Sequence, residues 1–167
     1  MTDVQVFFNR PGKSAGITEA ILADIRTATR FVAVASAWFT DDRIASAVIE
    51  SRAKGRLVLL NLSDIERPGA HKTADLLLDA AFRAKTDNEW FFVGVLGDPN
   101  YGDGLMHHKF VVADDIVWTG SFNLTYQAGK NYENAVRLQS AAVAKQYSDE
   151  AVALLDVFVD RVQGNPA

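Results

Sequence analysis

Three polar residues, His107, His108 and Lys109, stand at the head of an apolar run and could do acid–base or nucleophilic chemistry. Alternate side chains of a strand share a face, so we expect His107 and Lys109 to point together and His108 to point the other way. Neutral imidazole is a nucleophile near pH 7, its protonated form is an acid, and lysine supplies a positive charge. A His-x-Lys pair alone is more often a strand end that touches solvent, so other residues must decide between the two interpretations.

The residues that follow complete an ordered pattern. Asp114 lies five residues past Lys109, and Gly120, Ser121 and Asn123 close the next apolar run. The set His-x-Lys-x4-Asp followed by Gly-Ser-x-Asn resembles the signature of the phospholipase D superfamily. The segments ASAWFTDDRI, KGRLVLLNL and NYENAV resemble the small bacterial endonuclease branch of that superfamily, so the likeness covers most of the chain.

The pattern departs from the family in one spacing. Five residues separate Asp114 from Gly120, one fewer than the family usually has, and a shorter turn between two strands can absorb that loss. Asp114 belongs to the signature, and we expect it to orient this turn rather than to act on the substrate.

The resemblance implies a phosphodiesterase, and the residue types fit that chemistry. The reaction needs an attacking group, charge neutralisation on the non-bridging oxygens and a proton for the leaving oxygen. His107 would attack the phosphorus. Lys109, Ser121 and Asn123 would bind the phosphate oxygens. By resemblance, Glu133 is the acidic partner that holds His107 in the attacking tautomer.

The chain carries one copy of the pattern, whereas larger members of the superfamily carry two. One histidine cannot attack one face of phosphorus and also protonate a leaving oxygen on the opposite face. The other candidate, His71 with Lys72, is adjacent rather than alternate and has no Gly-Ser-x-Asn after it. We therefore expect a homodimer in which each subunit supplies His107 to one composite site, with a phosphohistidine intermediate.

A rival interpretation uses His107, His108 and Asp103 as metal ligands. Opposite strand faces make this set awkward, so we expect no metal and no other cofactor, with the lysines doing the electrostatic work. The chain has no cysteine, which excludes disulfides, thiolate metal sites and cysteine nucleophiles.

The composition is that of a single globular domain over residues 1–167. Hydrophobic residues make up 49% of the 167, which is enough for one core. The net charge is −4 and the pI is about 5.3, so a polyanion site must be a local cluster of Lys and Arg. The amino terminus lacks the layout of a secretory signal and no apolar run could span a bilayer, so we expect a cytoplasmic protein with no membrane partner.

Strand and helix alternate in the first half of the chain, and strands cluster in the second half. Short apolar runs predict buried strands, and spacings near 3.6 residues predict helices. These patterns predict an α/β fold, a three-layer sandwich with a mixed β-sheet flanked by helices. The expected strands are 4–8, 31–37, 56–62, 90–96, 107–113, 116–119 and 133–138, and the expected helices are 17–29, 41–54, 72–84 and 142–162.

Three functions remain open at this point. The first is a metal-independent endonuclease that acts on nucleic acid with little sequence preference. The second is a phospholipid phosphodiesterase or phosphatidyl transferase with the same histidine chemistry. The third is a non-catalytic, dimerising nucleic-acid-binding module, against which the intact pattern argues.

Two further expectations concern the surroundings of the site. We expect loop 98–106 to be able to cover substrate. We also expect four large aromatic residues to lie in the core, although one of them could line the cleft: Trp38, Phe39, Trp90 and Trp118.

Overall fold

The computed structural model describes residues 3–65, 71–84, 89–98 and 104–164. Within these residues a seven-stranded sheet forms the centre, in the order β1-β7-β6-β5-β2-β3-β4. β2, β3 and β4 run parallel to one another and the other neighbours are antiparallel, which confirms the predicted mixed sheet. The strands are β1 (Asp3–Asn9), β2 (Phe31–Ser36), β3 (Gly55–Asn61), β4 (Trp90–Leu96), β5 (Lys109–Ala113), β6 (Ile116–Gly120) and β7 (Glu133–Gln139).

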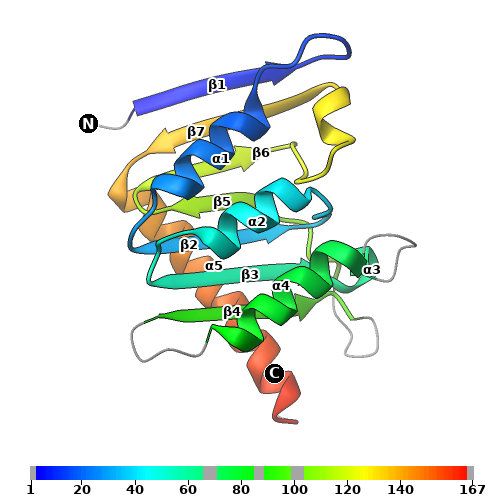
Figure 1. The fold of residues 1–167 in the computed structure, drawn as a ribbon, viewed down its shortest axis with the longest axis vertical. Helices are drawn as coiled ribbons and strands as arrows, with labels where there is room; N and C mark the ends of the chain where they lie inside the picture. The colour runs from blue at the N-terminus through cyan, green and yellow to red at the C-terminus, as the bar shows by residue number, and fades with distance from the viewer. Residues whose placement is uncertain (1–2, 66–70, 85–88, 99–103, 165–167) are drawn as a thin grey trace.

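Helices cover both faces of the sheet, which confirms the three-layer sandwich. α1, α2 and α4 lie over one face, and the long α5 crosses the other face (Figure 1). Among the described residues, no helix combines the length and the apolar character that crossing a membrane requires. The helices are α1 (Ile17–Thr27), α2 (Asp42–Glu50), α3 (Leu62–Ile65), α4 (His71–Arg83) and α5 (Ala141–Val162), and a short 3-10 turn, η2 (Ala128–Lys130), precedes β7.

Side chains of the central strands alternate between two apolar cores. Along β2, Val32 and Val34 pack beneath α1 and α2, whereas Ala33 and Ala35 face α5. β3 is buried along its whole length in the same way. Strands buried on both faces appear in the sequence as continuous apolar runs, which is why β2 and β3 were predictable.

Several boundaries differ from the expected ones. β5 begins at Lys109 rather than at residue 107, although the Ala37 N–H still donates to the His108 carbonyl at 2.9 Å. α2 ends at Glu50, because Ser51 turns the chain and Gly55 already pairs with the segment that leads into β2. The segment between the expected strand 56–62 and the expected helix 72–84 begins with a short helix, α3. Residues 66–70 of that segment, and residues 99–103 of the expected loop 98–106, lie outside the described residues.

The four aromatic residues expected in the core differ in how deeply they are buried. Phe39 and Trp118 are each 2% exposed, as predicted. The prediction is wrong for Trp90, which is 39% exposed because β4 is an edge strand. Its ring packs over Gly55, where an added Cβ would come within 2.4 Å of it. Trp38 is only partly buried and belongs to the site described below.

Asp114 lies at the end of β5 that is opposite to Lys109, with a φ of 54° in the tight turn before β6. Its carboxylate accepts backbone N–H bonds from Thr29 at 3.0 Å, Arg30 at 2.9 Å and Phe31 at 2.9 Å. Burial alone would raise the pKa of Asp114, but these three donors and the Arg30 guanidinium together lower it below its ordinary value of 3.8. The contacts join the β5–β6 turn to the start of β2, as expected of a residue that orients the turn.

Replacing this carboxylate should weaken the fold and leave the chemistry intact. We predict that Asp114→Asn lowers the free energy of unfolding by about 1 kcal/mol at pH 7, because three backbone donors, only one of them partly buried, lose a charged acceptor. The depressed pKa of Asp114 means that its stabilisation is present above the unfolded pKa and is lost as pH falls through the folded pKa. Urea unfolding at neutral and acidic pH should therefore show a difference between variant and wild type that shrinks on acidification.

Asp115→Asn is the matched control. Asp115 pairs with Arg30 at 2.8 Å in an exposed ion pair, so its loss should change the unfolding curve little. If Asp114→Asn instead abolished turnover without changing the unfolding curve, Asp114 would have a chemical role.

Candidate active site

The residues of the sequence pattern meet at one end of the sheet. β5 and β6 are antiparallel, as are β6 and β7, so the start of β5, the end of β6 and the start of β7 share an edge. Phe110 pairs with Thr119, and Gly120 pairs with Ala135. This register brings His107 and Lys109, the turn after Gly120, and Glu133 to the same edge. Asp114, the remaining member of the pattern, lies at the far end.

His107 and Lys109 contact each other directly. Lys109 Nζ lies 3.2 Å from Nδ1 and 3.3 Å from Nε2 of His107, and it donates to the His107 carbonyl oxygen at 3.1 Å. His108 points to the opposite face, where its Nε2 lies 3.3 Å from a carboxylate oxygen of Glu150 on α5. The predicted divergence of the two histidines is confirmed, because backbone pairing continues as far as His108.

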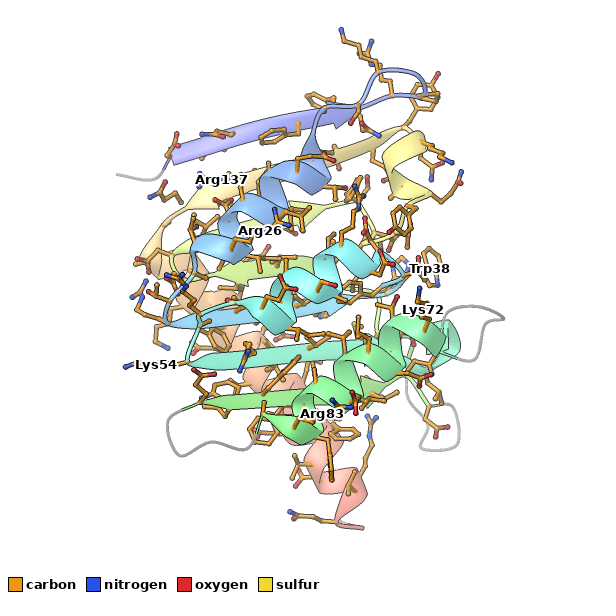
Figure 2. All side chains as sticks on the ribbon, viewed as in Figure 1. Arg26, Trp38, Lys54, Lys72, Arg83 and Arg137 are labelled. Carbon is orange, nitrogen blue, oxygen red and sulfur yellow. The ribbon has the colours of Figure 1, made fainter. Side chains whose placement is uncertain are left out.

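Trp38 forms one wall of the site. It was expected in the core with three other aromatic residues, of which one could line the cleft. Its ring meets the His107 ring edge-on, with centroids 5.8 Å apart and planes at 89°. Lys109 Nζ lies 5.9 Å from the centroid of the indole, close enough for a cation–π attraction. Figure 2 shows Trp38 at the end of the sheet where β2 stops. Its position directly after a buried strand was the available signal, since such residues reach the sheet edge.

Ser121 and Glu133 form the other side of the site. The Ser121 hydroxyl donates to the Glu133 carboxylate and accepts from the Asn134 N–H at 3.0 Å. Within the described residues no hydrogen bond joins Glu133 to His107, so the carboxylate that was expected to orient the imidazole is engaged with Ser121 instead. Glu133 also acts electrostatically on Lys109.

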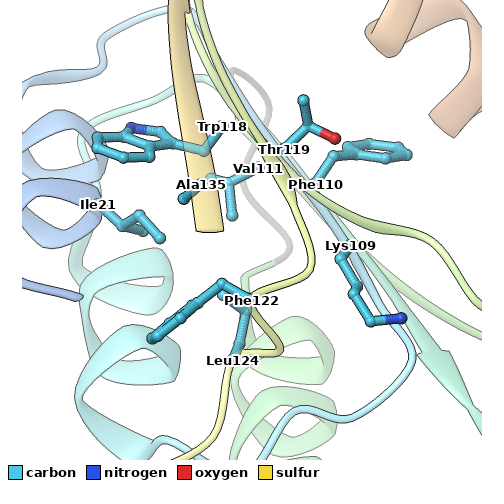
Figure 3. Close-up of a pocket in the computed structure, with 9 residues that line it drawn as sticks. All are labelled: Ile21, Lys109, Phe110, Val111, Trp118, Thr119, Phe122, Leu124 and Ala135. Carbon is cyan, nitrogen blue, oxygen red and sulfur yellow. The ribbon is translucent and has the colours of Figure 1, made fainter. Parts of the chain in front are cut away.

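Hydrogen bonds of the Leu124 backbone fix the turn that carries Asn123. The Leu124 carbonyl accepts from the N–H groups of Thr40 at 2.9 Å and Asp41 at 3.0 Å, and the Leu124 N–H donates to the Ser36 hydroxyl at 3.4 Å. Figure 3 shows Phe122 and Leu124 in the apolar lining beneath the strand ends, with the ammonium group of Lys109 pointing away from them. The backbone between these two anchors therefore presents Asn123 at the edge.

Asn123 has one unsatisfied atom. Its Oδ1 is buried and has no hydrogen-bond partner among the described residues. An amide oxygen only accepts hydrogen bonds, so this atom cannot bind the non-bridging oxygens of a phosphate. The Asn123 amide nitrogen is the group that can donate to them.

Contacts between the start of α2 and the turn after β6 add rigidity. Asp41 caps α2 and holds the guanidinium of Arg43 at 2.7 and 3.0 Å. Arg43 lies 5.0 Å from the centroid of the Tyr126 ring, and the Tyr126 hydroxyl donates to Asp42. The segment TDDR, residues 40–43, thus fixes the turn after β6 to the start of α2.

Lys109 and several exposed basic residues lie at this end of the sheet. Burial lowers the pKa of Lys109, and the Glu133 carboxylate partly opposes that shift. The exposed basic residues are Arg10 and Lys13 on the turn after β1, Lys130 on η2, and Lys72 at the start of α4, which lies at the same end as Trp38 in Figure 2. The carboxylates of Glu133 and Asp42 lie at this end too, so the expected local cluster of Lys and Arg stays a prediction.

The two histidines of the rival metal set do not point toward each other. His107 and His108 face opposite sides, and Asp103 lies outside the described residues. In the part of the chain that the structure describes, no group of three or more His, Cys, Asp or Glu side chains converges to hold a metal ion.

With this geometry in place, comparison with known proteins gives the family. The profile described as "Cardiolipin synthase, PLD-like domain" matches residues 21–155. The chain belongs to the phospholipase D-like family. A phospholipase D from Rickettsia bellii is 31% identical over 137 residues, which are 80% of this chain and 61% of that protein. The chain thus spans about three fifths of the length of this relative.

Two solved structures share the fold over nearly their whole length. Nuc from Salmonella typhimurium, a phospholipase D family member, has a TM-score of 0.71 at 21% identity, with 92% of this chain and 93% of that chain covered. NucT from Helicobacter pylori has a TM-score of 0.72 at 20% identity, with 93% and 97% covered. Both proteins are therefore of similar size to this chain.

The interaction between Glu133 and Lys109 should be visible in the pH dependence of turnover. We predict that Glu133→Gln moves the alkaline limb of kcat/KM to lower pH. The carboxylate raises the pKa of Lys109, so without it the lysine loses its charge earlier as pH rises. The profile is measured with a small chromogenic phosphodiester, and the position of the limb is compared even where the amplitude falls.

Glu150→Gln is the matched control, because Glu150 lies against His108 on the opposite face. The limb should keep its wild-type position in this variant. An alkaline limb that stayed in place in Glu133→Gln would assign it to a group other than Lys109.

Proposed function

We propose that this chain hydrolyses phosphodiester bonds of nucleic acid, as an endonuclease that needs no metal ion and forms a phosphohistidine. The observation that carries the proposal is the contact between His107 and Lys109 at the edge that also presents Ser121 and Asn123. A nucleophile, a cation and two neutral donors are the groups that displacement at phosphorus requires.

In the first step a ring nitrogen of His107 attacks phosphorus and the bond from phosphorus to the leaving oxygen breaks. The negative charge that grows on the non-bridging oxygens is met by Lys109 and by the amide N–H groups of Asn123, and the Ser121 hydroxyl joins them when it turns away from the Glu133 carboxylate. The product is a phosphohistidine and an alcohol. Trp38, edge-on to the imidazole, limits the orientations that the His107 ring can adopt.

The leaving oxygen needs a proton from the side opposite to His107. Within the part of the chain that the structure describes, the other histidine near the site, His108, faces α5 and cannot supply it. We infer that His107 of a second subunit does so across a two-fold axis. The same imidazole then takes a proton from water, which attacks phosphorus as the bond from nitrogen to phosphorus breaks. A homodimer with one composite site follows.

The exposed basic residues at this end of the sheet support nucleic acid as the substrate, because a polyanion needs local cations on a chain of net charge −4. Binding through these cations should weaken steeply as salt rises.

The decisive experiment traps the covalent intermediate. Denaturing the enzyme during turnover of a labelled oligonucleotide should leave acid-labile label on the protein. We expect the label on wild type and on His108→Ala, and none on His107→Ala, because only His107 shares a face with Lys109. Plasmid nicking should fall to background in His107→Ala and only mildly in His108→Ala, and wild-type nicking should persist in excess EDTA.

Equal loss of label in both histidine variants would refute the assignment of the nucleophile. Loss of nicking in EDTA that returns with added Mg²⁺ would refute metal independence. Tight binding of DNA by the wild type with neither label nor nicking would instead identify a non-catalytic nucleic-acid-binding module.

Mixing subunits tests the shared site. When wild type and His107→Ala are unfolded and refolded together in equal amounts, random pairing leaves about a quarter of the dimers with two intact histidines. We predict that activity follows the square of the wild-type fraction, measured by plasmid nicking at several ratios. A linear dependence on that fraction would mean that each subunit works alone.

A groove with one apolar wall favours one second candidate, phospholipid hydrolysis or phosphatidyl transfer. The groove has a volume of about 240 Å³ and lies beside His107. Its apolar wall is formed by Leu105, Met106, Leu154 and Val157, and His108 and Arg161 line the rest. The family description and the Rickettsia bellii relative also carry the names of lipid enzymes. The trapping experiment separates the two candidates, because a lipid enzyme would take its label from a phospholipid and not from an oligonucleotide.

A further inference from the structure

A second hollow opens beside the candidate active site, at the end of the edge strand β1. Its volume is about 350 Å³, and Ser121 and Glu133 form the wall that it shares with the site. Phe8, Arg10 and Tyr132 line the rest of it. Pairing between β1 and β7 accounts for this arrangement, because that ladder places Asn9 opposite Glu133 and carries its neighbours to the same edge.

Two aromatic rings in this hollow are exposed. Phe8 is 64% exposed and Tyr132 is 78% exposed, so neither ring contributes much to the core. An exposed phenylalanine on an edge strand also invites unwanted pairing with other chains. Folding therefore gives no reason for these residues, whereas a ligand with flat apolar faces would.

A buried side chain holds the hollow in shape. Asn9, which is 3% exposed, donates from Nδ2 to the Gly129 carbonyl at 2.7 Å, and its Oδ1 accepts from the Ala15 N–H at 2.9 Å. These bonds tie η2 to the turn after β1, which Arg10 and Lys13 close with reciprocal backbone bonds of 3.2 and 2.9 Å. The two segments that carry the cations and Tyr132 are thus fixed relative to the site.

We propose that Phe8, Arg10 and Tyr132 form a platform, here called the stacking platform, for nucleotides next to the scissile phosphate of a single-stranded nucleic acid. This inference rests on the proposed nuclease function. Aromatic side chains stack on bases of any sequence, and an adjacent arginine contacts the backbone phosphates. A duplex keeps its bases stacked on one another, so it offers no free base faces to Phe8 and Tyr132. The stacking platform therefore selects single strands.

Binding is measured by fluorescence anisotropy in the His107→Ala background, with a short labelled oligonucleotide and with its duplex. Phe8→Ala and Tyr132→Ala should each weaken single-strand binding by about tenfold, whereas Tyr132→Phe, which keeps the ring, should bind normally. Duplex binding should change little. Phe92→Ala is the matched control, because Phe92 is 51% exposed on the opposite edge strand, β4.

With His107 intact, the ratio of single-strand cleavage to turnover of a small chromogenic phosphodiester should fall about tenfold in Phe8→Ala and Tyr132→Ala. Unchanged single-strand binding in both variants would overturn the stacking platform, and equal loss on single strand and duplex would overturn its selectivity. Dissociation of the dimer in Phe8→Ala, seen by sedimentation, would place Phe8 in a subunit interface and also overturn it. Weakened single-strand binding in Phe8→Ala and Tyr132→Ala, together with a wild type that binds single strands but cleaves nothing, would support the stacking platform while refuting the nuclease.

Discussion

The alternation of chain direction between β5, β6 and β7 is the constraint on which the site depends. Antiparallel pairing returns the chain to the same edge after each pair of strands, so groups that are far apart in sequence meet there. Lys109 and Glu133 approach each other for this reason. A shift of one residue in either ladder would turn alternate side chains to the α5 face and dismantle the site. The carboxylate of Asp114, at the far end, holds the β5–β6 turn that sets this register.

Much of this could be predicted from the sequence, because periodicity and burial are local properties. The buried strands β2 and β3, the mixed sheet and the opposite orientations of His107 and His108 all follow from alternation along a strand. The contacts of Trp38 and the bond from Ser121 to Glu133 depend on how loops from distant elements meet at the edge. No spacing in one sequence encodes that meeting. The exposure of Trp90 was missed because strand order, which makes β4 an edge, is a tertiary property.

Three carboxylates of this acidic chain hold the framework around the site: Asp24, Asp41 and Asp114. Asp24 accepts from Trp118 Nε1 and from the guanidinium of Arg137, both at 2.7 Å, in the α1 layer. Asp114 binds backbone donors, and Asp41 is paired with Arg43. Each of these carboxylates holds in place an element that borders the site. The overall charge therefore says little about the field that an approaching phosphate meets at Lys109.

The apolar side chains packed beneath Lys109 strengthen the electric field of its ammonium group toward the open side of the site. The cavity bounded by Ile21, Trp118 and Phe122 has a volume of only about 10 Å³, so the floor under Lys109 is close-packed hydrocarbon that leaves almost no room for solvent (Figure 3). Hydrocarbon polarises weakly, and field lines from the ammonium group are confined to the open side instead of spreading into a screening medium. A single lysine can in this way attract a phosphate more strongly than the same charge on a fully hydrated surface.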